Sequence, residues 1–273
     1  MSSNVPIPST PSPLTPDHAR SLHSGPGRAR SGQFLADGIR LCWCLHRQRW
    51  PIAGFLSSRQ LLGSRPGREL REAWLAQGIP ELRCSANQFR SIGTAARSGG
   101  LAAIAAMRWL DWKELARRPG LWLACGAVAH PGNLGTLLRS AAALGAQGAL
   151  VLDDACDPYA PDALRASMGG IFSLGLIRGS TDSLQVFLAA HPGWRAWGAS
   201  PEAGSGLAAT DLRSPCIVLL GHERSGLTAA ERACCHGLVG IPMAEGWQSL
   251  NLGIAGSLVA YEAWRQRALT APA

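Results

Sequence analysis

The stretch CIVLLGHERSGL, residues 216–227, decides the fold class of this chain. Five apolar residues followed by a polar turn between two glycines are typical of a strand buried on both faces, ending in a loop that a ligand can approach. Further strands are expected at residues 121–128, 149–152, 171–176, 194–198 and 238–241, with helices at 134–144, 161–168, 183–190 and 249–267. This alternation predicts a parallel α/β sheet, with ligands bound beyond the carboxyl ends of its strands.

A smaller α/β unit is predicted upstream. Apolar runs at residues 52–56 and 101–106 flank an amphipathic helical pattern at 68–76. Residues 1–22 are rich in Ser and Pro and lack an apolar period, which is typical of a disordered tail. The expected organisation is a tail at 1–22, a small domain at 23–107, a linker at 108–120 and the main sheet domain at 121–273.

Charge is distributed unevenly along the chain. The net charge is +8, and Lys113 is the only lysine. Residues 1–115 hold 14 arginines and one lysine against 7 acidic residues, whereas residues 116–273 hold 11 arginines against 11 acidic residues. GC-rich coding would explain arginine over lysine, but not this split. The asymmetry predicts a polyanion-binding module joined to a neutral one.

The sequence does not favour a membrane protein or a metal-binding protein. No stretch approaches the roughly 20 apolar residues of a membrane span, and the N-terminus lacks the order of a signal peptide. The sequence around Cys42, Cys44 and His46 has no second cluster at zinc spacing, so we expect no metal. The eight cysteines form no C-x-x-C pair, and we expect reduced thiols and a cytoplasmic location.

Two other segments place polar residues after a predicted strand. HPGNLGTLLRS, residues 130–140, opens a helix that Asn133 could cap, with Arg139 about two turns along. IPMAEGWQSLN, residues 241–251, leads into a helix expected to begin at Ser249. Helix capping alone would explain each segment taken singly.

Together, the three segments resemble the SpoU-type (TrmH-like) family of the SPOUT superfamily, which are RNA ribose 2′-O-methyltransferases. The matching pieces are N-x-G-x-x-x-R at 133–139, G-x-E-x-x-G-L at 221–227, and I-P-M then S-L-N within 241–251. Their order and spacing fit the family over about residues 121–267. His222, Arg224 and Trp247 are unusual neighbours of these motifs.

Upstream, residues 32–39 and 98–104 are similar to a small RNA-binding domain often fused before SpoU-type domains, which itself looks like ribosomal RNA-binding proteins. The resemblance implies an N-terminal α/β RNA-binding domain and a parallel α/β catalytic domain with a C-terminal trefoil knot. The knot loops would hold S-adenosylmethionine through backbone groups of Gly221, Ile241 and Leu250. Such domains also form homodimers through the last helix.

The same resemblance assigns five catalytic residues. Arg139 would meet the phosphate and hydroxyl of the target nucleotide, and Asn133 would position Arg139 and the substrate. Glu223 would orient neighbouring side chains and take part in proton removal, while Ser249 and Asn251 would position substrate and cofactor. Since a guanidinium has a pKa above 12, we interpret Arg139 as an electrostatic clamp that favours the ionised hydroxyl.

Several functions remain open at this stage. Ribosomal RNA, of the 23S type, is the favoured substrate because the upstream module resembles ribosomal RNA-binding proteins, and transfer RNA is the alternative. A non-catalytic RNA-binding protein of the same fold is a second hypothesis. A nucleotide-dependent oxidoreductase is disfavoured because no G-x-G-x-x-G loop follows a strand.

Overall fold

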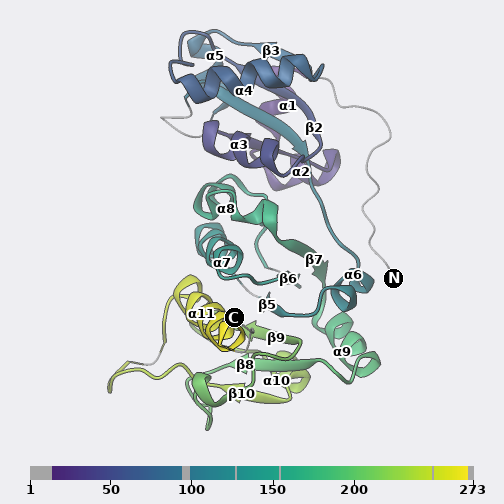
Figure 1. Ribbon diagram of the computed structural model, residues 1–273, viewed down its shortest axis with the longest axis vertical. Helices are drawn as coiled ribbons and strands as arrows, with labels where there is room; N and C mark the ends of the chain where they lie inside the picture. The colour runs from purple at the N-terminus through teal and green to yellow at the C-terminus, as the bar shows by residue number, and fades with distance from the viewer. Residues whose placement is uncertain (1–13, 94–98, 127, 154, 248, 270–273) are drawn as a thin grey trace. The chain divides into compact units, whose positions relative to one another are not determined.

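The computed structural model describes residues 14–93, 99–126, 128–153, 155–247 and 249–269 (Figure 1). The chain divides into two compact units. Unit 1 comprises residues 1–107 and 159–172, and unit 2 comprises residues 108–158 and 173–273. Each unit is built around a β-sheet of its own.

Unit 2 contains a six-stranded sheet in which every neighbouring pair is parallel. Residues of its central strands are buried on both faces, as the continuous apolar runs predicted. The parallel α/β architecture expected for this half is therefore confirmed. Across the sheet the order is β10 (Gly237–Val239), β8 (Arg195–Ala199), β9 (Cys216–Leu220), β5 (Leu121–Cys125), β6 (Gly148–Leu152) and β7 (Gly175–Gly179).

Helices cover both faces of this sheet (Figure 1). On one face α7 (Pro131–Ala143) and α11 (Leu252–Ala268) pack together over β5 and β9. A side chain at Gly256 would collide with Leu137 of α7, so glycine permits their close approach. The other face meets α6 (Trp112–Arg117), α9 (Thr181–Ala190) and α10 (Ala229–Cys234).

Unit 1 contains a mixed four-stranded sheet. β4 (Leu101–Ala106) runs antiparallel to β1 (Gln33–Asp37) and β2 (Ile52–Ser57), and β2 runs parallel to β3 (Glu81–Arg83). The small upstream α/β unit is therefore present. Its helices are α1 (Pro16–Ser21), α2 (Gly25–Ser31), α3 (Ile39–Arg47), α4 (Arg65–Ala76), α5 (Ala86–Ile92) and α8 (Pro161–Ser167).

A segment from the second half of the sequence completes the core of unit 1. Tyr159 and Phe172 flank the segment that holds α8, and both are buried. Their rings lie 4.9 Å and 5.8 Å from that of Phe34, and Phe172 also lies 5.2 Å from Trp50. The domains expected from the sequence are continuous stretches, so they did not assign residues 159–172 to unit 1.

The strand expected at residues 171–176 is present but begins four residues later. Residues Gly170–Ser173 form a 3₁₀ turn, and β7 begins only at Gly175. Ile171 and Phe172 are buried as part of unit 1, so their apolar character does not mark a sheet position. The true strand ends in Arg178 and Gly179, which gave no apolar signal.

The predicted tail is partly helical, and the predicted linker contributes to the core of unit 2. Helix α1 lies inside the predicted tail, where the Thr15 side chain caps it and Ala19 and Leu22 are buried. Residues 1–13 of that tail lie outside the described residues. The predicted linker contains α6, and its Leu115 is fully buried in the core of unit 2.

Candidate functional site

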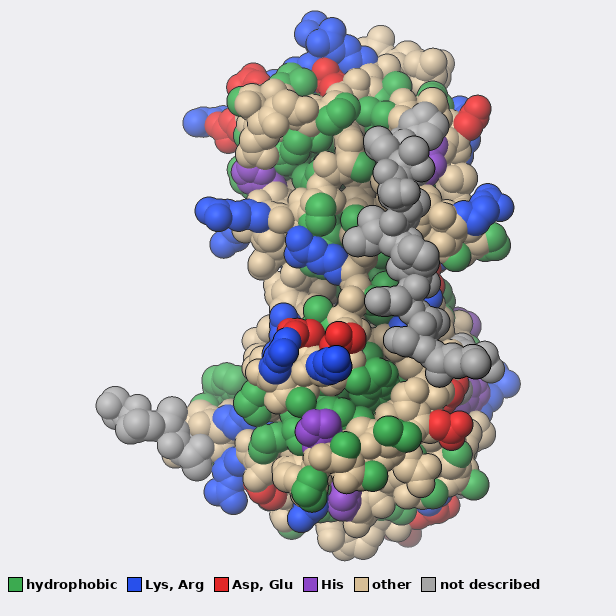
Figure 2. Space-filling model, turned by 90° about the vertical axis from the view of Figure 1, so that its right-hand side faces the viewer, with side chains coloured by type: hydrophobic (Ala, Val, Ile, Leu, Met, Phe, Trp, Pro, Cys, Tyr) green, Lys and Arg blue, Asp and Glu red, His purple; other side chains and the backbone are tan. Residues whose placement is uncertain are grey.

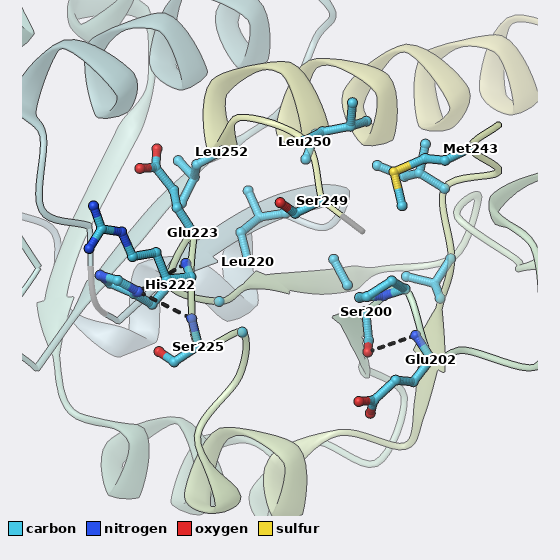
Figure 3. Close-up of a pocket in the computed structure, with 18 of the residues that line it drawn as sticks. Ser200, Glu202, Leu220, His222, Glu223, Ser225, Met243, Ser249, Leu250 and Leu252 are labelled. Atoms are coloured by element: carbon cyan, nitrogen blue, oxygen red, sulfur yellow. Dashed lines mark hydrogen bonds between the residues drawn. The ribbon is translucent and has the colours of Figure 1, made fainter. Parts of the chain in front are cut away.

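A cavity of about 740 Å³ lies beyond the carboxyl ends of three neighbouring strands in unit 2 (Figure 3). Its lining comes from the residues that follow β8, β9 and β10 and from the loop before α11. The cavity has the size of a small-molecule pocket and the position at which open parallel sheets bind ligands.

The cavity combines apolar walls with charged groups. Leu220, Ile241 and Leu250 contribute aliphatic surface that could cover a flat aromatic ring. Glu202 lies at one end and Glu223 at the other in Figure 3. Arg224 and Arg232 also line the cavity and balance these two carboxylates, and the apolar surface between the charged groups suits a nucleobase.

Asn133 and Glu223 form the central polar pair of the site. The Asn133 side-chain amide donates a hydrogen bond to Oε1 of Glu223, although 90 residues separate them in the chain. Asn133 does not cap α7 as expected: His130 is the N-cap, and Pro131 opens the helix. The Asn133 side chain is therefore free to reach across to the turn after β9.

Five of the eight residues singled out in the sequence line the cavity: Gly221, Glu223, Ile241, Ser249 and Leu250. Asn133 joins them through its hydrogen bond to Glu223. Arg139 is exposed on α7 and does not belong to the cavity lining within the described part of this chain.

Asn251 caps α11. Its Oδ1 accepts hydrogen bonds from the backbone N–H groups of Gly253 at 3.0 Å and Ile254 at 3.4 Å. The expected start of this helix at Ser249 is therefore wrong, because the helix begins at Leu252. Ser249 lies in the preceding loop, where it lines the cavity.

Polar residues after β8 were missed in the sequence. Ser200 and Glu202 both line the cavity, and Ser200 Oγ accepts a hydrogen bond from the Glu202 backbone N–H at 3.2 Å. Glu202 Oε2 also lies 3.0 Å from Nη2 of Arg232. The signal was available, since these residues follow an apolar strand, like those of the three segments that were recognised.

The cysteine thiols offer no nucleophile. All eight cysteines are free, and burial raises the pKa of both Cys125 and Cys235 to about 12. Such thiols stay protonated near neutral pH. In the described ranges, no three His, Cys, Asp or Glu side chains are placed to hold a metal ion. None of the helices described is long and apolar enough to span a membrane.

The fold and the site define a class: an α/β protein with a ligand pocket of apolar walls and charged groups beyond the ends of its parallel strands. The family model described as "SpoU rRNA Methylase family" matches residues 120–261. The chain therefore belongs to the SpoU rRNA methylase family, which confirms the resemblance of its three motifs.

Similar proteins cover both units. The chain is 30% identical over 249 residues to the 23S rRNA (uridine(2479)-2′-O)-methyltransferase of Streptomyces viridochromogenes, spanning 88% of this chain and 85% of that protein. It is also 30% identical over 206 residues to the 23S rRNA (guanosine-2′-O-)-methyltransferase RlmB of Xanthomonas campestris, spanning 73% and 83%. The structure of the SpoU methyltransferase AviRb from Streptomyces viridochromogenes with AdoMet matches with a TM-score of 0.81 at 28% identity, over 94% of this chain and 100% of that one.

Proposed function

We propose that this chain transfers a methyl group from S-adenosylmethionine to a ribose 2′-hydroxyl of 23S ribosomal RNA. Family membership and two relatives named as 23S rRNA 2′-O-methyltransferases support the reaction and the substrate. The observation that carries the proposal is the cavity itself, because motif residues from two of the family segments line it and the Asn133–Glu223 pair adds the third.

The residues present fit S-adenosylmethionine. Its adenine suits the apolar walls, and we propose that backbone groups of Gly221, Ile241 and Leu250 hold the adenosyl part. Its sulfonium and ammonium groups are cations, which the carboxylate of Glu223 favours electrostatically, since Glu202 is already paired with Arg232. When bound, the cofactor supplies a methyl group on a good leaving group.

The protein must then orient a poor nucleophile and relieve it of its proton. Glu223 accepts one hydrogen bond from Asn133, and its carboxylate retains acceptor capacity for a substrate hydroxyl. We assign proton acceptance or orientation to Glu223, and positioning to Asn133, Ser249 and Asn251. Arg139 would favour the ionised hydroxyl as a positive clamp.

Unit 1 is the proposed RNA-binding part. It holds 14 arginines against 6 acidic residues, whereas unit 2 holds 12 basic and 12 acidic residues. Arg30, Arg47 and Arg59 are exposed in unit 1, and Figure 2 shows Lys and Arg side chains standing out from its surface. Such side chains bind phosphates with an affinity that falls as salt rises.

A homodimer is proposed through α11. One face of α11 is buried against α7 and the sheet. Elsewhere on the same helix, four large apolar side chains are exposed: Ile254, Leu258, Tyr261 and Trp264. Exposed apolar side chains in a row along a helix mark an interface. Because Arg139 is exposed on the neighbouring helix α7, we propose that the active sites lie near this interface. A monomer by light scattering that retains full activity contradicts the dimer.

Two further proposals rest on family membership. The C-terminal part of unit 2 would be threaded as a trefoil knot. An experimental structure in which this part of the chain passes through no loop would contradict the knot. The protein would work in the cytoplasm with its thiols reduced, in keeping with eight free cysteines. Recovery of the protein in another cell fraction contradicts this location.

The direct test is methyl transfer with purified components. We expect labelled methyl from S-adenosylmethionine to enter 23S rRNA at one nucleotide and to protect the adjoining bond from alkali, as a 2′-O-methyl group does. Labelling of transfer RNA in place of 23S rRNA contradicts the substrate. Cofactor and RNA binding without any methyl transfer would indicate a non-catalytic RNA-binding protein of the same fold.

A further inference from the structure

The turn after β9 is held rigidly. Within it the backbone N–H of His222 donates to the Gly226 carbonyl, and the Gly226 N–H donates to the His222 carbonyl, both at 2.9 Å. Gly226 has a φ of 67°, which favours glycine. A side chain at Gly221 would collide with the backbone of Gly226 and Leu227, because the turn folds back on itself there.

The His222 ring adds a second set of restraints. Its Nδ1 accepts hydrogen bonds from the backbone N–H groups of Arg224 at 3.1 Å and Ser225 at 3.4 Å (Figure 3). Short polar side chains such as Asn make the same contacts at the start of many turns. His222 therefore fixes the backbone from which Arg224 projects.

Neighbouring residues of this turn serve different partners. Glu223 is held by Asn133, whereas Arg224 is exposed and lines the cavity. The other arginine in the lining, Arg232, is paired with Glu202 at 3.0 Å. Within the described part of the chain, the Arg224 guanidinium makes no ion pair.

We propose that Arg224 binds an RNA phosphate next to the target ribose and that His222 positions it. The inference rests on the proposed function, since it requires RNA at this cavity. A guanidinium binds phosphate through two parallel N–H groups, and a fixed backbone lowers the entropy lost when that contact forms. Arg224 thereby places the ribose near Glu223 independently of Arg139.

Arg224→Ala tests the phosphate contact. We expect the KM for a 23S rRNA fragment to rise about 10- to 100-fold, the range expected for loss of a hydrogen bond to a charged group. The slope of log affinity against log salt should fall by about 1. The Kd for S-adenosylmethionine should stay within about twofold, Arg224→Lys should recover part of the affinity, and Arg195→Ala is the control for an exposed arginine of unit 2.

Two results overturn the contact: an unchanged RNA affinity and salt slope in Arg224→Ala, or a loss of cofactor affinity that matches the loss of RNA affinity. Equilibrium RNA binding reports this comparison even if no methyl transfer is detected. Failure of the inference is therefore distinguishable from failure of the proposed function, which would show in the wild-type chain.

A pair of variants tests the positioning role of His222. His222→Ala removes the acceptor for two backbone N–H groups and should reproduce the higher KM of Arg224→Ala. His222→Asn places an amide oxygen where Nδ1 accepts those hydrogen bonds, so it should restore most of the RNA affinity. Equal defects in the two variants contradict the positioning role.

Discussion

Unit 1 and unit 2 have the same kind of architecture, a sheet covered by helices, but they carry different chemistry. Unit 1 has all of the net positive charge, whereas the cavity with its family motifs lies in unit 2, which is neutral. Under the proposed function, we expect affinity for RNA and the chemical step to depend largely on different residues. Variants should therefore change one property without the other.

The largest expected effect is on the chemical step. Arg139→Ala should slow methyl transfer about 10³-fold, because it removes the charge that favours the ionised hydroxyl. Cofactor affinity should change by no more than about twofold. Methyl incorporation under single-turnover conditions measures the rate, with Arg195→Ala as the matched control. Full activity of Arg139→Ala would contradict the catalytic role assigned to Arg139.

The next effect concerns the stability of unit 1. Burial alone would raise the pKa of Glu81, but hydrogen bonds from Arg71, Arg83 and Ser57 outweigh it and lower the pKa to about 2. The carboxylate of Glu81 therefore stabilises the fold above its unfolded pKa, near 4.5, and this contribution is lost as pH falls toward 2.

Glu81→Gln should lower the free energy of unfolding by about 3 kcal/mol at pH 7 and by far less at pH 2.5. Urea denaturation at both pH values measures the difference. Arg65 and Glu69 form an exposed ion pair on α4, so Glu69→Gln serves as the control with a much smaller effect. An equal loss at both pH values contradicts the account of Glu81.

A smaller effect is expected at the cavity. In Gly221→Ala the added carbon would collide with backbone atoms of the turn, which should cost about 1–3 kcal/mol and weaken S-adenosylmethionine binding by a similar amount. Gly193→Ala in the same unit has open space for the added carbon and should bind normally. Calorimetric titration compares the two, and equal affinities would show that this turn does not shape the cofactor site.

The smallest expected effect concerns the charge of unit 1. Arg47→Ala combined with Arg59→Ala should weaken RNA binding about tenfold and reduce the salt slope by about 1–2. The same change at Arg195 and Arg213, which are exposed in unit 2, should matter less. If the two double variants weaken binding equally, the division of roles between the units is wrong.

Substitution is a better test of unit 1 than deletion. Residues 159–172 are part of its core, and Tyr159 and Phe172 pack on Phe34. Removal of residues 1–107 would expose those two rings and leave α8 without its packing surface. A truncated chain that fails would therefore say little about RNA binding.

Apolar runs revealed most of the fold because strands buried on both faces need continuous hydrophobic sequence. β5, β6 and β9 were predictable on this ground. The signal failed at Ile171 and Phe172, whose apolar side chains fill unit 1, so that a local pattern could not reveal their packing partner. It also failed at α1, a six-residue helix whose stability depends on tertiary packing.

The candidate site was predictable where motifs were recognised and not where contacts join distant segments. The family resemblance assigned Gly221, Ile241 and Leu250 to the cofactor site, and all three line the cavity. The Asn133–Glu223 hydrogen bond spans 90 residues, so it could not be read from sequence. The starts of two helices were predicted at the wrong residues. Helix α7 begins at Pro131, three residues before the expected start, and α11 begins at Leu252 after its N-cap Asn251.

One measurement tests the central claim most directly: mapping of 2′-O-methyl groups in ribosomal and transfer RNA from a strain that lacks this protein. We predict that one 23S rRNA position loses its methyl group. The wild-type chain should restore it, whereas Arg139→Ala, Glu223→Gln and an empty vector should not. Ribosomal RNA that keeps every 2′-O-methyl group without the protein, with a site lost in transfer RNA or nowhere, would contradict the claim.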